Sequence, residues 1–169
     1  ADDKVFEEND NYLEFLLAGY VDLGDILIDV RENLYLIKTL NTDKLSNKLT
    51  LERSQEKVIK KALQEYSTFF DYIFIDCPPS LVILTTNALG AADSVLIPVQ
   101  CEYFALEGIM QLINTIMLAQ KKVNPNLDIE GVLLTMLTTN TNLGLEVVDS
   151  IKGFFKERVY DTIIPRLIR

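Results

Sequence analysis

The hydrophobic pattern of this chain alternates between helical spacing and short continuous apolar runs. Helical spacing is clearest at 106–117, where apolar residues recur every three or four positions until Asn124-Pro125 ends the run. Similar spacing predicts a helix at 51–66, with Thr50 as its N-cap. Further helices are expected at 11–18, 22–30 and 81–91, and around an inward set formed by Val147, Val148, Ile151, Phe154 and Phe155.

Between these helices lie short apolar runs that predict buried strands. They cover 34–37, 72–76, 94–99, 131–136 and a last short stretch near 162–164. Their apolar residues are continuous rather than alternating, which is typical of strands that crossover helices bury on both faces. The pattern therefore predicts an α/β fold: a three-layer, mostly parallel sheet with helices on both faces, formed by one domain over residues 1–169.

The amino-acid composition excludes several classes of protein function. The chain has no histidine, which excludes His-based triads and His metal sites. Cys77 and Cys101 are too few for a disulfide scaffold and are expected as reduced thiols in the cytoplasm. No apolar run reaches the ~18 residues of a membrane span, so we expect no integral membrane segment.

The net charge of −9 is unevenly spread. Residues 1–30 hold nine acids and one lysine, a net charge of −8. From Ser150 onward five basic residues face two acids, a net charge of +3. The acidic start would repel nucleic acid and the basic end would attract it, although a solvated surface explains either cluster as well.

The candidate chemistry lies where the predicted strands end. Ligands of parallel sheets bind outside the carboxyl ends of the strands, where Asp76, Gln100 and Thr138 fall. Asp76 closes a run of four apolar residues, a place where a carboxylate can hold a metal-bound phosphate. The simpler alternative is a strand that ends in a turn residue.

One stretch carries a specific resemblance. The run "FDYIFIDCPPSLVILTTNALGAADSVLIPVQCEYFALEG", together with "IIPRLIR" near the end, resembles the ParA/Soj branch of the deviant-Walker ATPases, relatives of MinD that partition chromosomes and plasmids. The resemblance implies a P-loop NTPase-like fold. It also implies that Asp76 is the catalytic Walker B carboxylate, which holds Mg²⁺ through water, and that Pro165 and Arg166 line the adenine pocket.

The same resemblance implies ATP and Mg²⁺ as cofactors and a nucleoid-associated homodimer. Its other partners would be nonspecific DNA and a centromere-binding ParB-like protein that stimulates hydrolysis. Arg169 matches a DNA-contacting arginine of the family, whereas Asn140 stands where a second one is expected. The segment from Glu102 to Glu107 is expected at an ATP-sandwiched dimer interface, although Glu107 alone also suits the first turn of a helix.

The family's glycine-rich phosphate loop and the C-terminal portion of the family fold have no match within the chain. The local G-x-x-x-x-G match, Gly19 to Gly24, is followed by Asp25, whose charge would repel phosphate. We therefore expect an incomplete nucleotide site, and a chain that alone neither binds ATP tightly nor hydrolyses it. The alternatives to a partitioning ATPase are a non-hydrolysing ParA-like interaction module and a MinD-like membrane-cycling ATPase.

Overall fold

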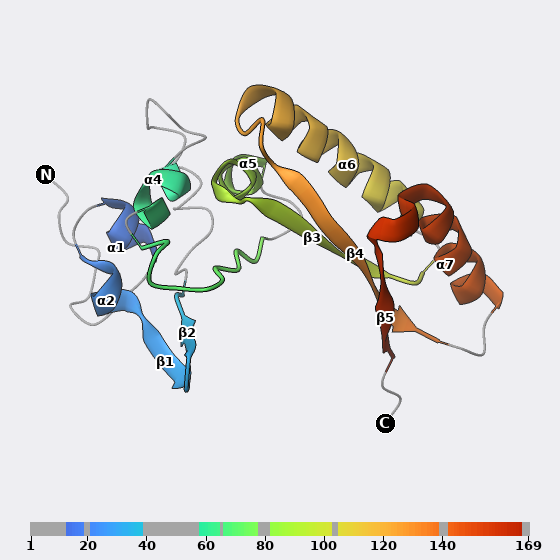
Figure 1. Cartoon of the computed structure of the whole chain (residues 1–169), viewed down its shortest axis with the longest axis horizontal. Coiled ribbons are helices and arrows are strands. Elements are labelled where there is room, and N and C mark those ends of the chain that lie inside the picture. Colours follow the sequence, from blue (N-terminus) through green and yellow to red (C-terminus); the bar gives the residue numbers. More distant parts are fainter. Residues whose placement is uncertain are drawn as a thin grey trace, which may run out of the picture. The chain divides into compact units, whose positions relative to one another are not determined.

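The computed structural model describes residues 13–18, 21–38, 58–64, 66–77, 82–102, 105–138 and 142–166. The chain divides into two compact units, residues 1–91 and 92–169, and each unit is described here by itself. Unit 1 contains α1 (Leu13–Ala18), α2 (Leu23–Ile26), β1 (Ile28–Arg31), β2 (Leu34–Leu36), α4 (Val58–Gln64) and α5 (Val82–Ala91) (Figure 1). Unit 2 contains β3 (Ser94–Gln100), α6 (Ala105–Lys122), β4 (Asp128–Leu137), α7 (Asn142–Phe155), the 3₁₀ turn η2 (Lys156–Arg158) and β5 (Val159–Pro165).

The core of unit 1 forms where α1, α4 and α5 meet. Leu84 of α5 is buried, and partly buried side chains pack against it from all three helices: Leu13, Leu17, Val58 and Ile83. Asn87 is fully buried among them. Both polar atoms of its side-chain amide are hydrogen-bonded: Oδ1 accepts the Val58 N–H at 3.2 Å, and Nδ2 donates to the Ile83 carbonyl at 3.1 Å. The side chain thus joins the start of α4 to α5 without leaving a buried polar group unpaired.

The helix predicted at 22–30 is wrong over most of its length. Only α2 is helical, and the next residues form β1, which pairs antiparallel with β2 so that Ile28 lies opposite Leu36. Apolar and polar residues alternate along β1, which suits a strand rather than a helix. Asn33 makes the turn possible with φ of 58°, a left-handed conformation that asparagine tolerates well. The predicted strand at 34–37 therefore exists, but in a separate hairpin.

The strand predicted at 72–76 is also wrong, since residues 72–77 form no regular secondary structure. Tyr72 and Phe74 are 81% and 83% exposed, and their rings stack on each other at 6.3 Å between centroids. A strand exists only by pairing its backbone with a neighbour, and no strand of the described part of unit 1 pairs with this segment. The segment has the apolar composition of a strand, but it lacks the backbone hydrogen bonds to a second strand that would make it one.

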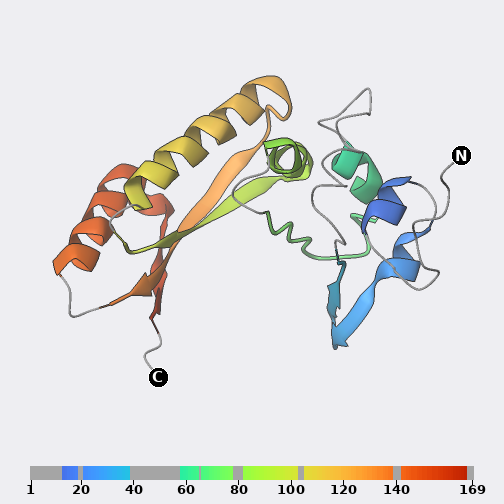
Figure 2. The ribbon, with the colours of Figure 1, turned by 180° about the vertical axis from the view of Figure 1, so that it is seen from behind.

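Unit 2 confirms the predicted parallel sheet. Its strands lie in the order β3-β4-β5 and both pairs are parallel. The common direction of the strands can be followed from the front and from behind (Figures 1 and 2). The helices predicted after the first two strands are present as α6 and α7, and the last short strand is present as β5.

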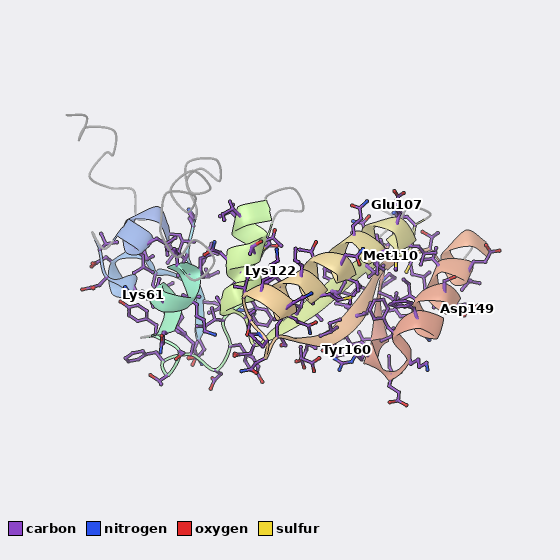
Figure 3. The ribbon with its side chains drawn as sticks, turned by 90° about the horizontal axis from the view of Figure 1, so that it is seen from above. Lys61, Glu107, Met110, Lys122, Asp149 and Tyr160 are labelled. Atoms are coloured by element: carbon purple, nitrogen blue, oxygen red, sulfur yellow. The ribbon has the colours of Figure 1, made fainter. Side chains whose placement is uncertain are left out.

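Both α6 and α7 lie on the same side of this sheet (Figures 1 and 3). The strands present alternate residues to these helices, and four of them form the buried layer: Ile97, Val99, Val132 and Leu134. On the opposite face Leu96 and Ile164 remain 42% and 46% exposed. The core of unit 2 is therefore the layer between the sheet and one pair of helices.

Four of the five residues predicted to face inward from α7 are buried, but Phe154 is 56% exposed. It lies in the last turn of the helix and lines an open hollow of about 430 Å³ together with Ile113 and Ile129. Its ring contacts Phe155 edge-on at 4.8 Å between centroids. The hollow leaves one side of the Phe154 ring in solvent, which explains why helical spacing alone misplaced it.

Candidate functional site

The three parallel strands of unit 2 end along one edge of the sheet. Gln100, the last residue of β3, is paired with Thr135 of β4, and Leu137 of β4 is paired with Pro165 at the end of β5. The backbone pairing continues one residue beyond β5, because the Arg166 N–H donates to the Leu137 carbonyl at 3.1 Å. Parallel pairing thus brings residues from three distant parts of the chain to the carboxyl edge, where such sheets bind ligands.

An ion pair crosses this edge between the loops that follow β3 and β5. The Arg166 guanidinium donates to the Glu102 carboxylate, and the two residues are 64 positions apart in sequence. The side chains are 45% and 53% exposed, so the pair is within reach of a ligand at the edge. Solvent screens an exposed pair of this kind, and its contribution to folding is small.

The structure places the residues predicted for the adenine pocket together. Pro165 ends β5, and Arg166 follows directly; both are exposed at the carboxyl edge. Gln100 lies at the same edge, and Thr138 follows the last residue of β4. Sequence reasoning did not find the contact between Glu102 and Arg166. Its only signal was the opposite charge of two residues that follow β3 and β5, the two strands on either side of β4.

Asp76 belongs to unit 1 and is exposed on the segment 72–77. Its neighbour Cys77 is half-buried, and burial first and the Asp76 charge second raise the pKa of the Cys77 thiol. The other thiol, Cys101, is buried just after β3, and burial raises its pKa as well. Both cysteines are free, as the sequence predicts. Arg169, predicted to contact DNA, lies outside the described residues, and so does Asn140, which stands where the family has a second DNA-contacting arginine.

The side chains that could act as metal ligands decide which kind of metal site the chain can form. Within the described ranges no three His, Cys, Asp or Glu side chains gather into a group that could hold a metal ion. An exposed carboxylate such as Asp76 still fits Mg²⁺, which keeps several of its waters and takes one or two carboxylates together with substrate phosphates.

No helix in the described part of the chain is long and apolar enough to cross a membrane.

A parallel α/β sheet with polar and charged side chains gathered at its carboxyl edge is the arrangement of open α/β proteins, which bind their ligands at that edge. Comparison with known families narrows this class. A family profile described as an AAA domain matches residues 3–129, about three quarters of the chain. The chain belongs to this family, in its ParA/Soj branch.

Two curated relatives support this assignment. The sporulation initiation inhibitor protein Soj of Bacillus subtilis is 48% identical over 157 residues, which cover 86% of this chain and 62% of that protein. The chromosome partitioning protein ParA of Myxococcus xanthus is 50% identical over 121 residues, covering 72% of this chain and 43% of that protein. The chain therefore spans less than two thirds of the length of each of these relatives.

A solved structure confirms the fold class. Cobyrinic acid a,c-diamide synthase from Mycobacterium smegmatis, with bound ATP analog and magnesium, is similar with a TM-score of 0.84 and 30% sequence identity. The similarity covers 95% of this chain and 66% of that one. The parallel sheet with its helices is therefore that of the P-loop NTPase-like class.

Proposed function

We propose that this protein acts as a ParA-type ATPase in chromosome or plasmid partitioning. The observation that carries the proposal is the identity of about half of the aligned residues to proteins named Soj and ParA. In this proposal the protein dimerises on ATP, binds DNA without sequence preference and hydrolyses ATP when a centromere-binding ParB-like protein stimulates it. Residues 1–169 would form one ATPase domain, in the cytoplasm and associated with the nucleoid.

In this proposal different residues bind the magnesium ion and the adenine of ATP. Asp76 would hold Mg²⁺ through water, and the ion would supply positive charge to the phosphates and to their transition state. Pro165 and Arg166 would contact the adenine at the carboxyl edge of unit 2. Arg166 suits this task because its backbone is already fixed by the hydrogen bond to Leu137. The chemical step is the in-line attack of water on the γ-phosphate, so the protein contributes chiefly position and charge.

DNA and the second protomer contact other parts of the proposed protein. Arg169 follows Arg166 by three positions and would contact a phosphate of the DNA backbone, which gives affinity without sequence preference. The loop from Glu102 into the first turn of α6 would face the second protomer of an ATP-bound homodimer. Figure 3 shows Glu107 near the start of α6.

A non-hydrolysing interaction module is the second candidate function, because one observation favours it. Of the two glycines with phosphate-loop spacing, Gly24 falls in the described part of the chain, in α2. Gly24 lies inside this four-residue helix, and the Asp25 carboxylate accepts the Asp22 N–H at 3.1 Å. A carboxylate therefore occupies the place where a phosphate would need free backbone N–H groups.

The first prediction tests the proposed function through Asp76→Asn. In a protein that carries this chain behind a phosphate loop, we expect Mg²⁺-dependent ATP turnover to fall at least about 100-fold, the scale of losing one electrostatic group from an active site. The fold should be retained, since Asp76 is exposed. Steady-state ATPase assays and thermal unfolding measure the two properties.

Asp71→Asn is the matched control, because Asp71 is an exposed carboxylate on the segment that leads to Asp76. It should leave turnover nearly unchanged. Turnover by Asp76→Asn within about threefold of the unsubstituted protein would remove Asp76 from the Walker B role. An unsubstituted protein that neither binds nor hydrolyses ATP would favour the interaction module instead.

A further inference from the structure

The described part of unit 2 carries two exposed ion pairs at opposite ends of the same sheet. At the amino end, Arg158, the last residue of η2 before β5, pairs with Asp128 at the start of β4 at 3.0 Å. At the carboxyl end, Arg166 pairs with Glu102. The two pairs are similar in chemistry and in exposure, but only the second lies at the edge where ligands of parallel sheets bind. Both ion pairs can therefore contribute to stability, but only the pair of Arg166 and Glu102 is placed to contribute to ligand binding.

The backbone around Glu102 is fixed on both sides. Its own N–H donates to the Gln100 carbonyl at 2.8 Å, and its carbonyl accepts the Ala105 N–H at 3.0 Å as the chain enters α6. The preceding residue, Cys101, is buried and donates its N–H to the Thr135 carbonyl of β4 at 2.9 Å. The Glu102 carboxylate is therefore attached to a residue whose backbone N–H and carbonyl are both hydrogen-bonded.

The Arg166 side chain needs such an anchor. Its backbone is held by Leu137, but an exposed guanidinium on a long stem samples many rotamers. Binding a ligand then requires immobilising the side chain, which weakens affinity unless another contact has already restricted it. The ion pair with Glu102 supplies that restriction from the neighbouring loop.

We propose that Glu102 is a positioning residue for nucleotide binding: it holds the Arg166 side chain across the ends of β3 and β5 so that Arg166 meets the base of the nucleotide preorganised. The assignment rests on the proposed function, in which Arg166 lines the adenine pocket. Glu102 acts through Arg166 and touches neither the phosphates nor the attacking water. Its loss should therefore weaken ATP binding.

The test compares Glu102→Gln with Asp128→Asn in the protein that carries this chain behind a phosphate loop. Each substitution removes one exposed ion pair, so both should lower the melting temperature slightly and by similar amounts. Only Glu102→Gln should raise the Kd for ATP, by about 3- to 10-fold, as expected when one side chain must be immobilised on binding. The preference for ATP over GTP should decrease as well, because Arg166 meets the base of the nucleotide in this proposal. Glu102→Asp, which keeps the charge, should recover part of the affinity.

Four outcomes of this experiment test the positioning role of Glu102. A higher Kd for Glu102→Gln alone, with partial recovery by Glu102→Asp, supports the positioning role. Equal ATP affinity in Glu102→Gln and the unsubstituted protein overturns it. Equal losses of affinity in Glu102→Gln and Asp128→Asn also overturn it, because they indicate a general loss of stability. If the unsubstituted protein binds no ATP, the proposed function fails, and the assignment of Glu102 fails with it.

Discussion

At the scale of the residue, charge placement at the ends of strands leads to a prediction about pH. A hydrogen bond from Arg158 chiefly lowers the pKa of the Asp128 carboxyl, and the Ile129 N–H adds to the effect. A carboxyl group whose pKa is lower in the folded state stabilises the fold above its unfolded pKa, and this contribution disappears as the pH falls through the folded pKa. Asp128 should therefore stabilise unit 2 at neutral pH but not in strong acid.

The measurement is thermal unfolding of the chain and of Asp128→Asn at two pH values. At pH 7 the substituted chain should melt at a slightly lower temperature. Well below about pH 3.9, the ordinary pKa of an aspartate, the difference should shrink to nothing, because the unsubstituted carboxyl is then protonated too. A difference of the same size at both pH values would show that Asp128 acts through something other than its charge.

The candidate site shows which residue contacts a sequence can predict. Gln100 and Thr138 were predicted at strand ends from the hydrophobic pattern, and the structure has them there, whereas Pro165 and Arg166 were proposed from the family resemblance and lie at the end of β5. The partner of Arg166 could not be predicted, since Glu102 approaches it only after β3, β4 and β5 have aligned their ends. Contacts between loops depend on the register of the sheet, which the apolar pattern of single strands leaves open.

At the scale of the element, patterns repeated over many residues predicted well and short ones did not. The helix α6 was found because its spacing persists over many positions, and β3 and β4 because their apolar runs are continuous. By contrast, β1 has only four residues, and its alternation is too short to distinguish it from the helix predicted at 22–30, although its partner strand β2 was predicted. The segment 72–77 has the composition of a strand and yet forms none, because pairing is a property of two segments.

A further prediction concerns how β4 and β5 approach each other. Gly131 is buried in β4, and a Cβ atom added there would lie 2.6 Å from the Tyr160 ring and 3.0 Å from the Arg158 carbonyl oxygen. Gly131→Ala should therefore destabilise the chain by about 1–3 kcal/mol, as overpacking does. Chemical denaturation of the substituted and unsubstituted chains measures the change.

Two further variants test the cause. Gly131→Ala combined with Tyr160→Ala should recover about half of the loss, because the closer of the two clashes is removed. Gly153→Ala in α7 is the matched control, since a Cβ there would meet nothing within 4 Å. It should stabilise the helix slightly, by about 0.5–1 kcal/mol. A destabilising Gly153→Ala would mean that losses at Gly131 do not report on its contact with Tyr160.

At the scale of the whole molecule, the question is what this chain can bind by itself. Tight binding of a triphosphate requires backbone N–H groups around the phosphates and a lysine to balance their charge. Around α2, the place with matching glycine spacing, the structure shows instead the carboxylate of Asp25 on the Asp22 N–H. Asp76 adds another negative charge, so Mg²⁺ would be the only bridge between this carboxylate and a nucleotide.

The last prediction is therefore that the 169-residue chain binds ATP and Mg²⁺ too weakly for a calorimetric signal at micromolar nucleotide and does not hydrolyse ATP. A version extended at the N-terminus by a glycine-rich phosphate loop should bind, because the loop supplies the missing N–H groups and lysine. Isothermal titration of both versions, each with and without Mg²⁺, makes the comparison, and ADP serves as a second ligand. Micromolar binding by the shorter version would reveal a phosphate site that neither the glycine spacing nor the carboxyl edge indicates. Weak binding by both versions would instead favour the non-hydrolysing interaction module over the partitioning ATPase.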